Sequence, residues 1–117
     1  MDIKACYKEF GGDYEDVYLR LMSDERIERF VKKFVELDDC AAMLTALEAG
    51  DYKTAFLKAH DLKGTSSGLG MTKLYKSSSR LCEALRGGEP SEDVHSLSEQ
   101  VRIDCGAIIS AVEKYSG

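Results

Sequence analysis

The near-absence of proline is the feature that most restricts what this chain can fold into. Its 117 residues contain a single proline, Pro90, so long stretches can hydrogen-bond as uninterrupted helix. Residues that favour helix, such as Ala, Leu, Glu, Lys and Arg, are abundant in these stretches. We therefore expect helices nearly throughout, separated at glycines and at capping side chains.

The expected breaks combine glycine with short polar residues, which end and start helices for different reasons. Gly11-Gly12-Asp13 ends a first short helix and supplies Asp13 as the N-cap of the next. Ser23-Asp24-Glu25 starts a further helix, and Asp38-Asp39 is either another cap or a bend. Residues 50–51, 68–72 and 87–91 mark the remaining turns and loops.

Between these breaks, apolar or small residues recur at steps of three and four, which is typical of amphipathic helices. The expected stripes are Ile27, Phe30, Val31, Phe34 and Val35; Ala42, Leu44, Leu47 and Ala49; Tyr52, Ala55, Phe56, Ala59, Leu62, Ser66 and Leu69; Leu74, Ser78, Leu81 and Leu85; and Val94, Leu97, Val101, Cys105, Ile108, Val112 and Tyr115. Short loops make consecutive helices antiparallel neighbours. We predict a single all-α domain over residues 1–117, an up-down antiparallel four-helix bundle with additional short N-terminal helices.

Composition argues against several classes of partner. Lys and Arg total 16 and Asp and Glu total 21, so the net charge is −5, which disfavours nucleic acid and anionic membranes. A transmembrane helix needs about 20 consecutive apolar residues, and no such run occurs. The first residues lack the profile of a signal peptide. We expect a cytoplasmic, monomeric protein that binds neither nucleic acid nor membrane.

The cysteines and the absent nucleotide motifs limit the chemistry further. The four cysteines are scattered without C-x-x-C spacing, so we expect reduced, packed thiols and no metal. Dinucleotide-binding and P-loop fingerprints are also absent, which argues against an ATP site. A carboxylate-bridged metal enzyme would need Glu-x-x-His pairs on facing helices, and the sequence offers one such spacing, from Glu92 to His95.

The most informative stretch surrounds His60. On a helix, His60, Lys63, Gly64 and Ser67 stand at i, i+3, i+4 and i+7 and share one face, rotated away from the apolar stripe. Glycine within a helix costs about 1 kcal/mol relative to alanine, so Gly64 calls for an explanation. It either leaves room for a large group to approach the imidazole or permits close helix packing. His95, by contrast, has no such pattern around it and is expected to be a plain surface residue.

This face suits phosphoryl transfer. A histidine with an ordinary pKa of about 6.5 is largely neutral at cellular pH and is then a competent nucleophile. Lys63 can place positive charge against the phosphoryl oxygens. Since such transfer depends mainly on positioning and charge compensation, little further chemistry is needed from this chain.

The same residues resemble the histidine-containing phosphotransfer (Hpt) domain of bacterial and plant phosphorelays. The family pattern is a histidine, then Lys-Gly at three and four residues on, a glycine at ten and a leucine at fourteen. This chain carries that pattern as His60, Lys63-Gly64, Gly70 and Leu74. The lead-ins at 10–13 and 47–51 and the helix expected from 72 to 85 also resemble the family.

The resemblance implies a phosphocarrier without a kinase activity or cofactor of its own. A receiver-domain aspartyl phosphate would donate to His60, and another receiver aspartate would accept the group; the Mg²⁺ belongs to the receiver. Lys63 would stabilise the phosphoryl group. Receiver domains, and in some systems a hybrid histidine kinase, would be the partners. The residues expected to dock the receiver are Gly64, Ser67, Cys82 and Arg86.

The chain departs from the family at one position. Many members carry a glutamine or glutamate twenty-two residues after the histidine, where it holds the other ring nitrogen; here that residue is Cys82, and a thiol is a weak partner. The orienting group is left open between Ser79, Glu83, a water and a backbone carbonyl. The alternative function is a non-catalytic module of this fold that binds a receiver or regulator without carrying phosphate.

Overall fold

The computed structural model describes residues 1–91 and 93–116, and this part of the chain forms helices and no strand. The helices are α1 (Ile3–Phe10), α2 (Tyr14–Leu21), α3 (Asp24–Leu37), α4 (Asp39–Glu48), α5 (Tyr52–Gly68), α6 (Thr72–Leu85) and α7 (Val94–Ser116). The all-α prediction and the prediction of additional short N-terminal helices are confirmed. None of the described helices is long and apolar enough to cross a membrane.

Capping side chains start the helices where the sequence indicated. Asp13, Ser23 and Asp51 each accept a hydrogen bond from the backbone N–H three residues further on, at the starts of α2, α3 and α5. Asp38 has a left-handed backbone with φ of 45°, ends α3 and caps α4 through Ala41. The Asp38-Asp39 segment is therefore both a cap and a bend.

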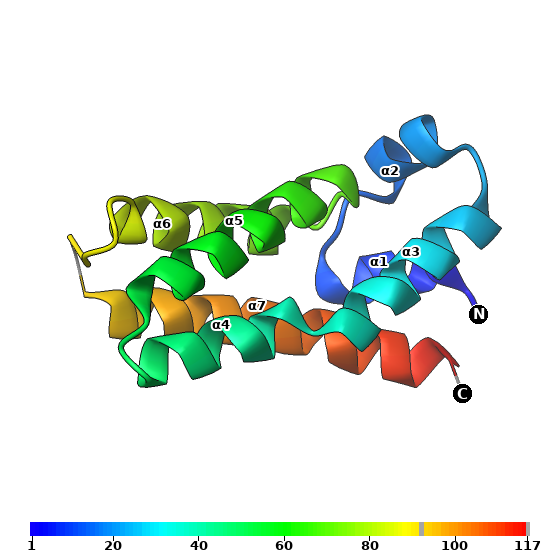
Figure 1. Ribbon diagram of the computed structural model, residues 1–117. Coiled ribbons are helices and arrows are strands. Elements are labelled where there is room, and N and C mark those ends of the chain that lie inside the picture. Colours follow the sequence, from blue (N-terminus) through cyan, green and yellow to red (C-terminus); the bar gives the residue numbers. More distant parts are fainter. Residues whose placement is uncertain (92, 117) are drawn as a thin grey trace.

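Helices α4 to α7 pack around a common core. α4 contacts α5, α5 contacts α6, α6 contacts α7, and α7 also contacts α4. In Figure 1 these helices lie along one another, while α1, α2 and α3 gather at the end of the molecule where both termini lie. Ion pairing supports that end, because Lys114 of α7 lies 3.0 Å from Glu9 of α1. The helix that carries His60, α5, thus packs against both α4 and α6.

Two predicted apolar stripes are wrong in part. Phe30 is 52% exposed, because α3 turns Ile27, Val31 and Phe34 toward the core instead. In α4 the buried residues are Cys40, Met43 and Ala46, whereas Ala49 is exposed and Ala42, Leu44 and Leu47 are half-buried. The bend at Asp38 changes the direction in which α4 presents its side chains, which periodicity alone does not reveal.

All four cysteines are free and buried, as the sequence predicted. Their thiols fill gaps between helices as small apolar groups do. Burial raises the pKa of the Cys6 thiol to about 11, with the nearby carboxylates of Glu9 and Asp2 adding to the rise. This thiol therefore remains protonated at neutral pH.

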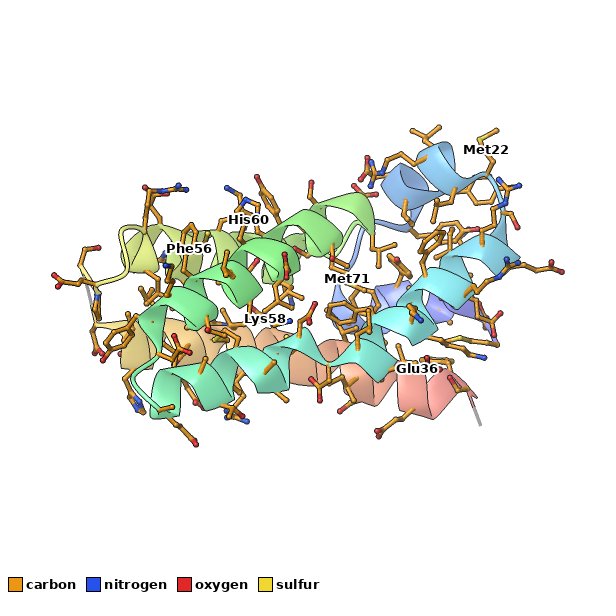
Figure 2. The ribbon with its side chains drawn as sticks, in the orientation of Figure 1. Met22, Glu36, Phe56, Lys58, His60 and Met71 are labelled. Carbon is orange, nitrogen blue, oxygen red and sulfur yellow. The ribbon has the colours of Figure 1, made fainter. Side chains whose placement is uncertain are left out.

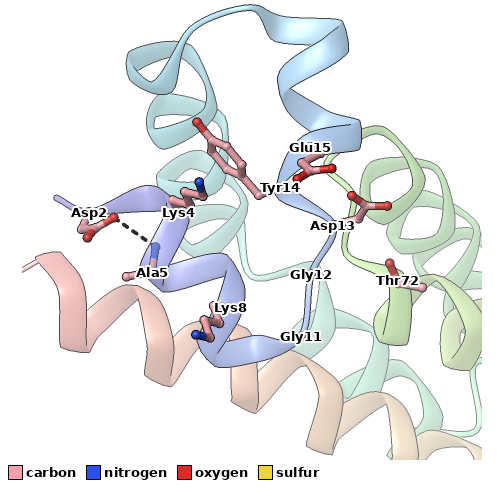
Figure 3. Close-up of a pocket in the computed structure, with 10 residues that line it drawn as sticks. All are labelled: Asp2, Lys4, Ala5, Lys8, Gly11, Gly12, Asp13, Tyr14, Glu15 and Thr72. Atoms are coloured by element: carbon pink, nitrogen blue, oxygen red, sulfur yellow. Dashed lines mark hydrogen bonds between the residues drawn. The ribbon is translucent and has the colours of Figure 1, made fainter.

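The turn between α5 and α6 is held by the linker between α1 and α2. Asp13 N–H donates to the Gly70 carbonyl over 2.8 Å, and the buried Tyr7 hydroxyl donates to the Leu69 carbonyl over 2.6 Å. Gly70 has φ of 64°, and a Cβ added there would lie 2.6 Å from the Asp13 carbonyl oxygen. Figure 3 shows Gly12 and Asp13 beside Thr72, where α6 begins. Gly70 is thus required both by its backbone angle and by the close approach.

The C-terminal end of α5 receives a further cap from α2. The guanidinium of Arg20 donates to the carbonyls of Ser67 and Gly68, with Nη2 distances of 3.2 and 3.0 Å. Asp16, one turn earlier in α2, lies 2.7 Å from the same nitrogen. A cation at a helix C-terminus satisfies free carbonyls and complements the helix dipole. α5 is therefore fixed at the end that follows the His60 face.

Candidate functional site

The face of α5 that carries His60 is open to solvent. His60, Gly64 and Ser67 are exposed and Lys63 is half-buried, so the expectation that these residues share an accessible face is confirmed. The neighbouring Ala59 and Leu62 are fully buried and fix the rotation of the helix. The imidazole therefore projects from a rigid helix rather than from a loop.

The space around Gly64 is open. A Cβ added at this position would meet nothing within 4 Å, apart from the local helix backbone. Close packing against another helix therefore does not explain this glycine. The other explanation from the sequence, room for a group that approaches the imidazole, remains.

A hollow of about 720 Å³ lies away from the His60 face, between α1, the linker to α2 and the start of α6 (Figure 3).

An aromatic side chain lies beside His60. Figure 2 shows Phe56 and His60 one helical turn apart on α5. The centroids of their rings are 6.2 Å apart, with 41° between the ring planes. Arg86, which ends α6, places its guanidinium carbon 5.5 Å from the centroid of the Phe56 ring. The side chain that follows α6 thus reaches Phe56 beside His60, and the docking role of Arg86 stays a prediction.

Cys82 lies beneath this site and not on its surface. It is only 1% exposed, because its helix turns it toward the core with Leu81 and Leu85. The prediction that Cys82 lines the docking surface is therefore wrong with respect to its exposure. Burial raises the pKa of the Cys82 thiol, while the positive charges of Arg86 and Lys63 act in the opposite direction.

The two residues considered for orienting the ring differ in their contacts. The Oγ of Ser79 is buried and has no hydrogen-bond partner, whereas exposed Glu83 accepts a hydrogen bond from Arg86 Nε over 3.1 Å. In the described structure no hydrogen bond joins either of them to His60. The orienting role of Ser79, of Glu83 or of another group stays a prediction.

Sequence reasoning missed three contributions to this region. Periodicity places Phe56 only in the apolar stripe, although its position four residues before His60 puts it on a neighbouring part of the helix surface. Tyr7 and Arg20 hold the turn after α5, and they come from segments 62 and up to 48 residues away in sequence. Such distant pairs leave no local spacing from which to find them.

The metal-enzyme alternative gains no support from the described residues. Residues 1–91 and 93–116 contain no group of three or more His, Cys, Asp or Glu side chains placed to hold a metal ion. Glu92, half of the Glu92–His95 spacing, lies outside the described residues. His95 is exposed, and its backbone N–H donates a hydrogen bond to Asp93 Oδ1 at the start of α7.

Comparison with known families agrees with the geometry of this face. A profile of the Hpt domain matches residues 32–113, which is more than half of the chain and includes α4, α5, α6 and most of α7. Searches of curated proteins and of solved structures found no significant match. Hpt domains act in histidine phosphotransfer, are phosphocarriers rather than kinases, and interact with receiver domains. This chain, with an exposed histidine on its central helix, belongs to the Hpt domain family.

Proposed function

We propose that this chain is a histidine phosphotransfer protein that accepts a phosphoryl group on His60 from a receiver-domain aspartyl phosphate and passes it to another receiver aspartate. One observation carries the proposal: an exposed imidazole with a lysine three residues on and open space at the position of Gly64. A large partner can therefore bring its phosphorylated carboxylate up to the ring. Lys63, three residues further along the same helix, would supply positive charge where negative charge develops.

The transfer is a simple substitution at phosphorus. The lone pair on Nε2 of the neutral imidazole forms the new N–P bond, and the bond from phosphorus to the aspartyl oxygen breaks. Its electron pair leaves with the receiver's carboxylate, and Nδ1 keeps the ring proton. Onward transfer reverses these steps with a second receiver. The Mg²⁺ that these reactions use belongs to the receiver, and we propose no cofactor for this chain.

Each predicted residue has a distinct part in the proposal. Lys63 pairs with the phosphoryl oxygens, and Gly64 and Ser67 keep the approach along α5 free of large side chains. Arg86 lies at the edge, where it can meet an acidic partner surface. Receiver aspartates and their phosphoryl group are anionic, so cations on this face favour the encounter despite the net charge of −5.

Apolar residues extend the proposed docking surface. Leu57, three residues before His60, is 56% exposed, and Tyr75 of α6 is 39% exposed. Beyond the far end of α5, a hollow of about 360 Å³ is lined by apolar side chains that include Leu21, Phe30 and Leu69. Protein interfaces commonly bury apolar side chains inside a polar rim. We propose that the receiver covers this surface when it engages His60.

We also propose the finer architecture that this function needs. Each of α4, α5 and α6 contacts the next helix along the chain, and α7 contacts α4. This ring of contacts supports an up-down antiparallel four-helix bundle within a single domain over residues 1–117. A protein of this kind would bind one receiver at a time as a monomer. The partners are receiver domains of response regulators and, in some systems, a hybrid histidine kinase.

Phosphotransfer from a panel of phosphorylated receivers tests the proposal. Wild type, His60→Gln and the control His95→Gln are incubated with each labelled receiver. We expect wild type and His95→Gln to take up label that is lost in acid and stable in base, as phosphohistidine is, and His60→Gln to take up none. Equal labelling of all proteins, or label on His60→Gln alone, would contradict it.

The buried Cys82 supports one second candidate. Without the usual orienting side chain, the fold could bind a receiver or regulator without carrying phosphate. The same panel separates the two functions, because this module would bind receivers with micromolar or tighter affinity while wild type remained unlabelled.

A further inference from the structure

The ring of Phe56 lies within interaction range of two charged or titratable groups of the site. Its centroid is 6.2 Å from that of the His60 imidazole, within the range over which aromatic rings attract one another. The guanidinium carbon of Arg86 is 5.5 Å from the same ring, within the range of a cation–π interaction. Phe56 therefore connects α5 with the end of α6 at the phosphotransfer site.

Arg86 would be poorly positioned without such a contact. Its side chain is 55% exposed, and it follows the last residue of α6, where the chain leaves the helix. The Nε hydrogen bond to Glu83 is exposed and therefore weak, and a long arginine side chain loses considerable freedom when it is held in place. The half-buried Phe56 ring provides a second, rigid contact for the guanidinium.

The position of the guanidinium matters because of the charge it carries. Arg86, at the end of α6, lies against the Phe56 ring that neighbours His60, and Lys63 follows His60 by three residues on α5, so each helix contributes one cation to this region. A phosphoryl group on His60 carries close to two negative charges, and arginine can pair with two of its oxygens. An arginine held in advance loses less entropy when that pair forms.

We propose that Phe56 is a positioning residue of the phosphotransfer site, whose ring holds the guanidinium of Arg86 beside His60, in the arrangement that receives the phosphoryl group. This inference rests on the proposed function. Phe56 itself takes no part in bond making. It acts through Arg86, and its effect disappears when Arg86 is absent.

Transfer kinetics test this dependence with a double-mutant cycle. Phe56→Leu keeps an apolar side chain of similar size but lacks a π face, and Phe56→Tyr restores the face. We expect Phe56→Leu to lower the maximal transfer rate by about three- to fivefold, with receiver affinity within twofold of wild type. Phe56→Tyr transfers at the wild-type rate, and Phe56→Leu has no added effect in an Arg86→Ala background.

NMR spectroscopy provides a readout that does not require phosphotransfer. The ring current of Phe56 shifts the ring protons of His60 and the Nε–H of Arg86. In Phe56→Leu these signals move toward the positions they have in unstructured peptides, while those of His95 stay in place. Ile103→Ala, which truncates an apolar residue that is 50% exposed on α7, serves as the control and moves neither signal.

The outcomes separate this inference from the proposed function. If Phe56→Leu transfers at the wild-type rate, or slows transfer equally with and without Arg86, the positioning role is wrong although His60 carries phosphate. If the NMR signals respond as expected but no protein is ever labelled, the proposed function fails while the contact itself is real. Unchanged His60 and Arg86 signals in Phe56→Leu overturn the inference in either case.

Discussion

Gly64 and Gly70 lie six residues apart, yet their surroundings are opposite. A Cβ at Gly64 would meet nothing within 4 Å, whereas a Cβ at Gly70 would lie 2.6 Å from the Asp13 carbonyl oxygen. Gly64 has ordinary helical backbone in the middle of α5, while Gly70 has a positive φ in the turn that follows. One glycine leaves a surface open, and the other lets two backbones meet.

The difference divides α5 and its turn into two regions with different requirements. The His60 face can be changed with little effect on the fold, because His60, Gly64 and Ser67 are exposed to solvent. The turn after α5 is held by Gly70, Tyr7 and Arg20, so substitutions there act on stability. The predictions below test this division through the free energy of unfolding, from the largest expected effect to the smallest.

Gly70→Ala is expected to destabilise the protein by about 3 kcal/mol, since alanine is strained at positive φ and its Cβ would displace the Asp13 backbone. Urea unfolding followed by circular dichroism measures the change. Gly50→Ala is the matched control, because Gly50 has φ of 72° but nothing within 4 Å of its Cβ position. Its expected loss is about 1 kcal/mol. Equal losses in the two variants would show that the close approach at Gly70 is relieved without cost.

Tyr7→Phe is expected to lose about 1–2 kcal/mol near neutral pH, because the buried Leu69 carbonyl is left without its donor. The loss depends on pH. Burial raises the pKa of the Tyr7 hydroxyl above its ordinary value of about 10, so the unfolded chain ionises first. The stability contributed by Tyr7 is therefore complete below about pH 10 and is lost as the pH rises further.

Urea unfolding of wild type and Tyr7→Phe at about pH 8 and about pH 11 checks this pH dependence. We expect the difference in unfolding free energy between the two proteins to shrink at the higher pH. A difference that grows with pH would mean that the ionised hydroxyl is stabilised in the folded state, contrary to its burial against Leu69.

Arg20→Gln is expected to cost less than about 1 kcal/mol, because this cap of α5 is exposed to solvent. Thermal unfolding at low and high salt measures it, and the cost decreases at high salt, where exposed charges are screened. Arg102→Gln, which removes an exposed pair with Glu99 on α7, is the control for a surface ion pair without a helix end. If both variants lose the same amount, the carbonyl contacts of Arg20 contribute nothing.

Gly64→Ala is expected to have the smallest effect and the opposite sign, with a gain of up to about 1 kcal/mol, because alanine favours helix and the space is open. Gly64→Leu should keep the helical circular dichroism spectrum while it weakens receiver binding or transfer. A Gly64→Leu protein that transfers at the wild-type rate would contradict the role assigned to the open space.

Local features of this protein could be predicted from the sequence because they depend on neighbours a few residues apart. The cap at Asp13, the helix starts at Ser23 and Asp51, and the shared face of His60, Lys63 and Gly64 follow from residue types and spacing within one or two turns of helix. The predicted apolar stripes were wrong at Phe30 and in α4. Their burial depends on how α3 packs and on how the chain bends at Asp38.

The sequence by itself determined the helical class, the helix ends and the residue types that meet on the His60 face. Only the tertiary structure decided that Gly70 carries a backbone contact, that Cys82 lies beneath the site, and that the Phe56 ring is within interaction range of both His60 and Arg86. The physical reason is distance along the chain. Helix spacing is set by covalent geometry within a turn, whereas contacts between helices depend on how separate apolar faces pack against one another.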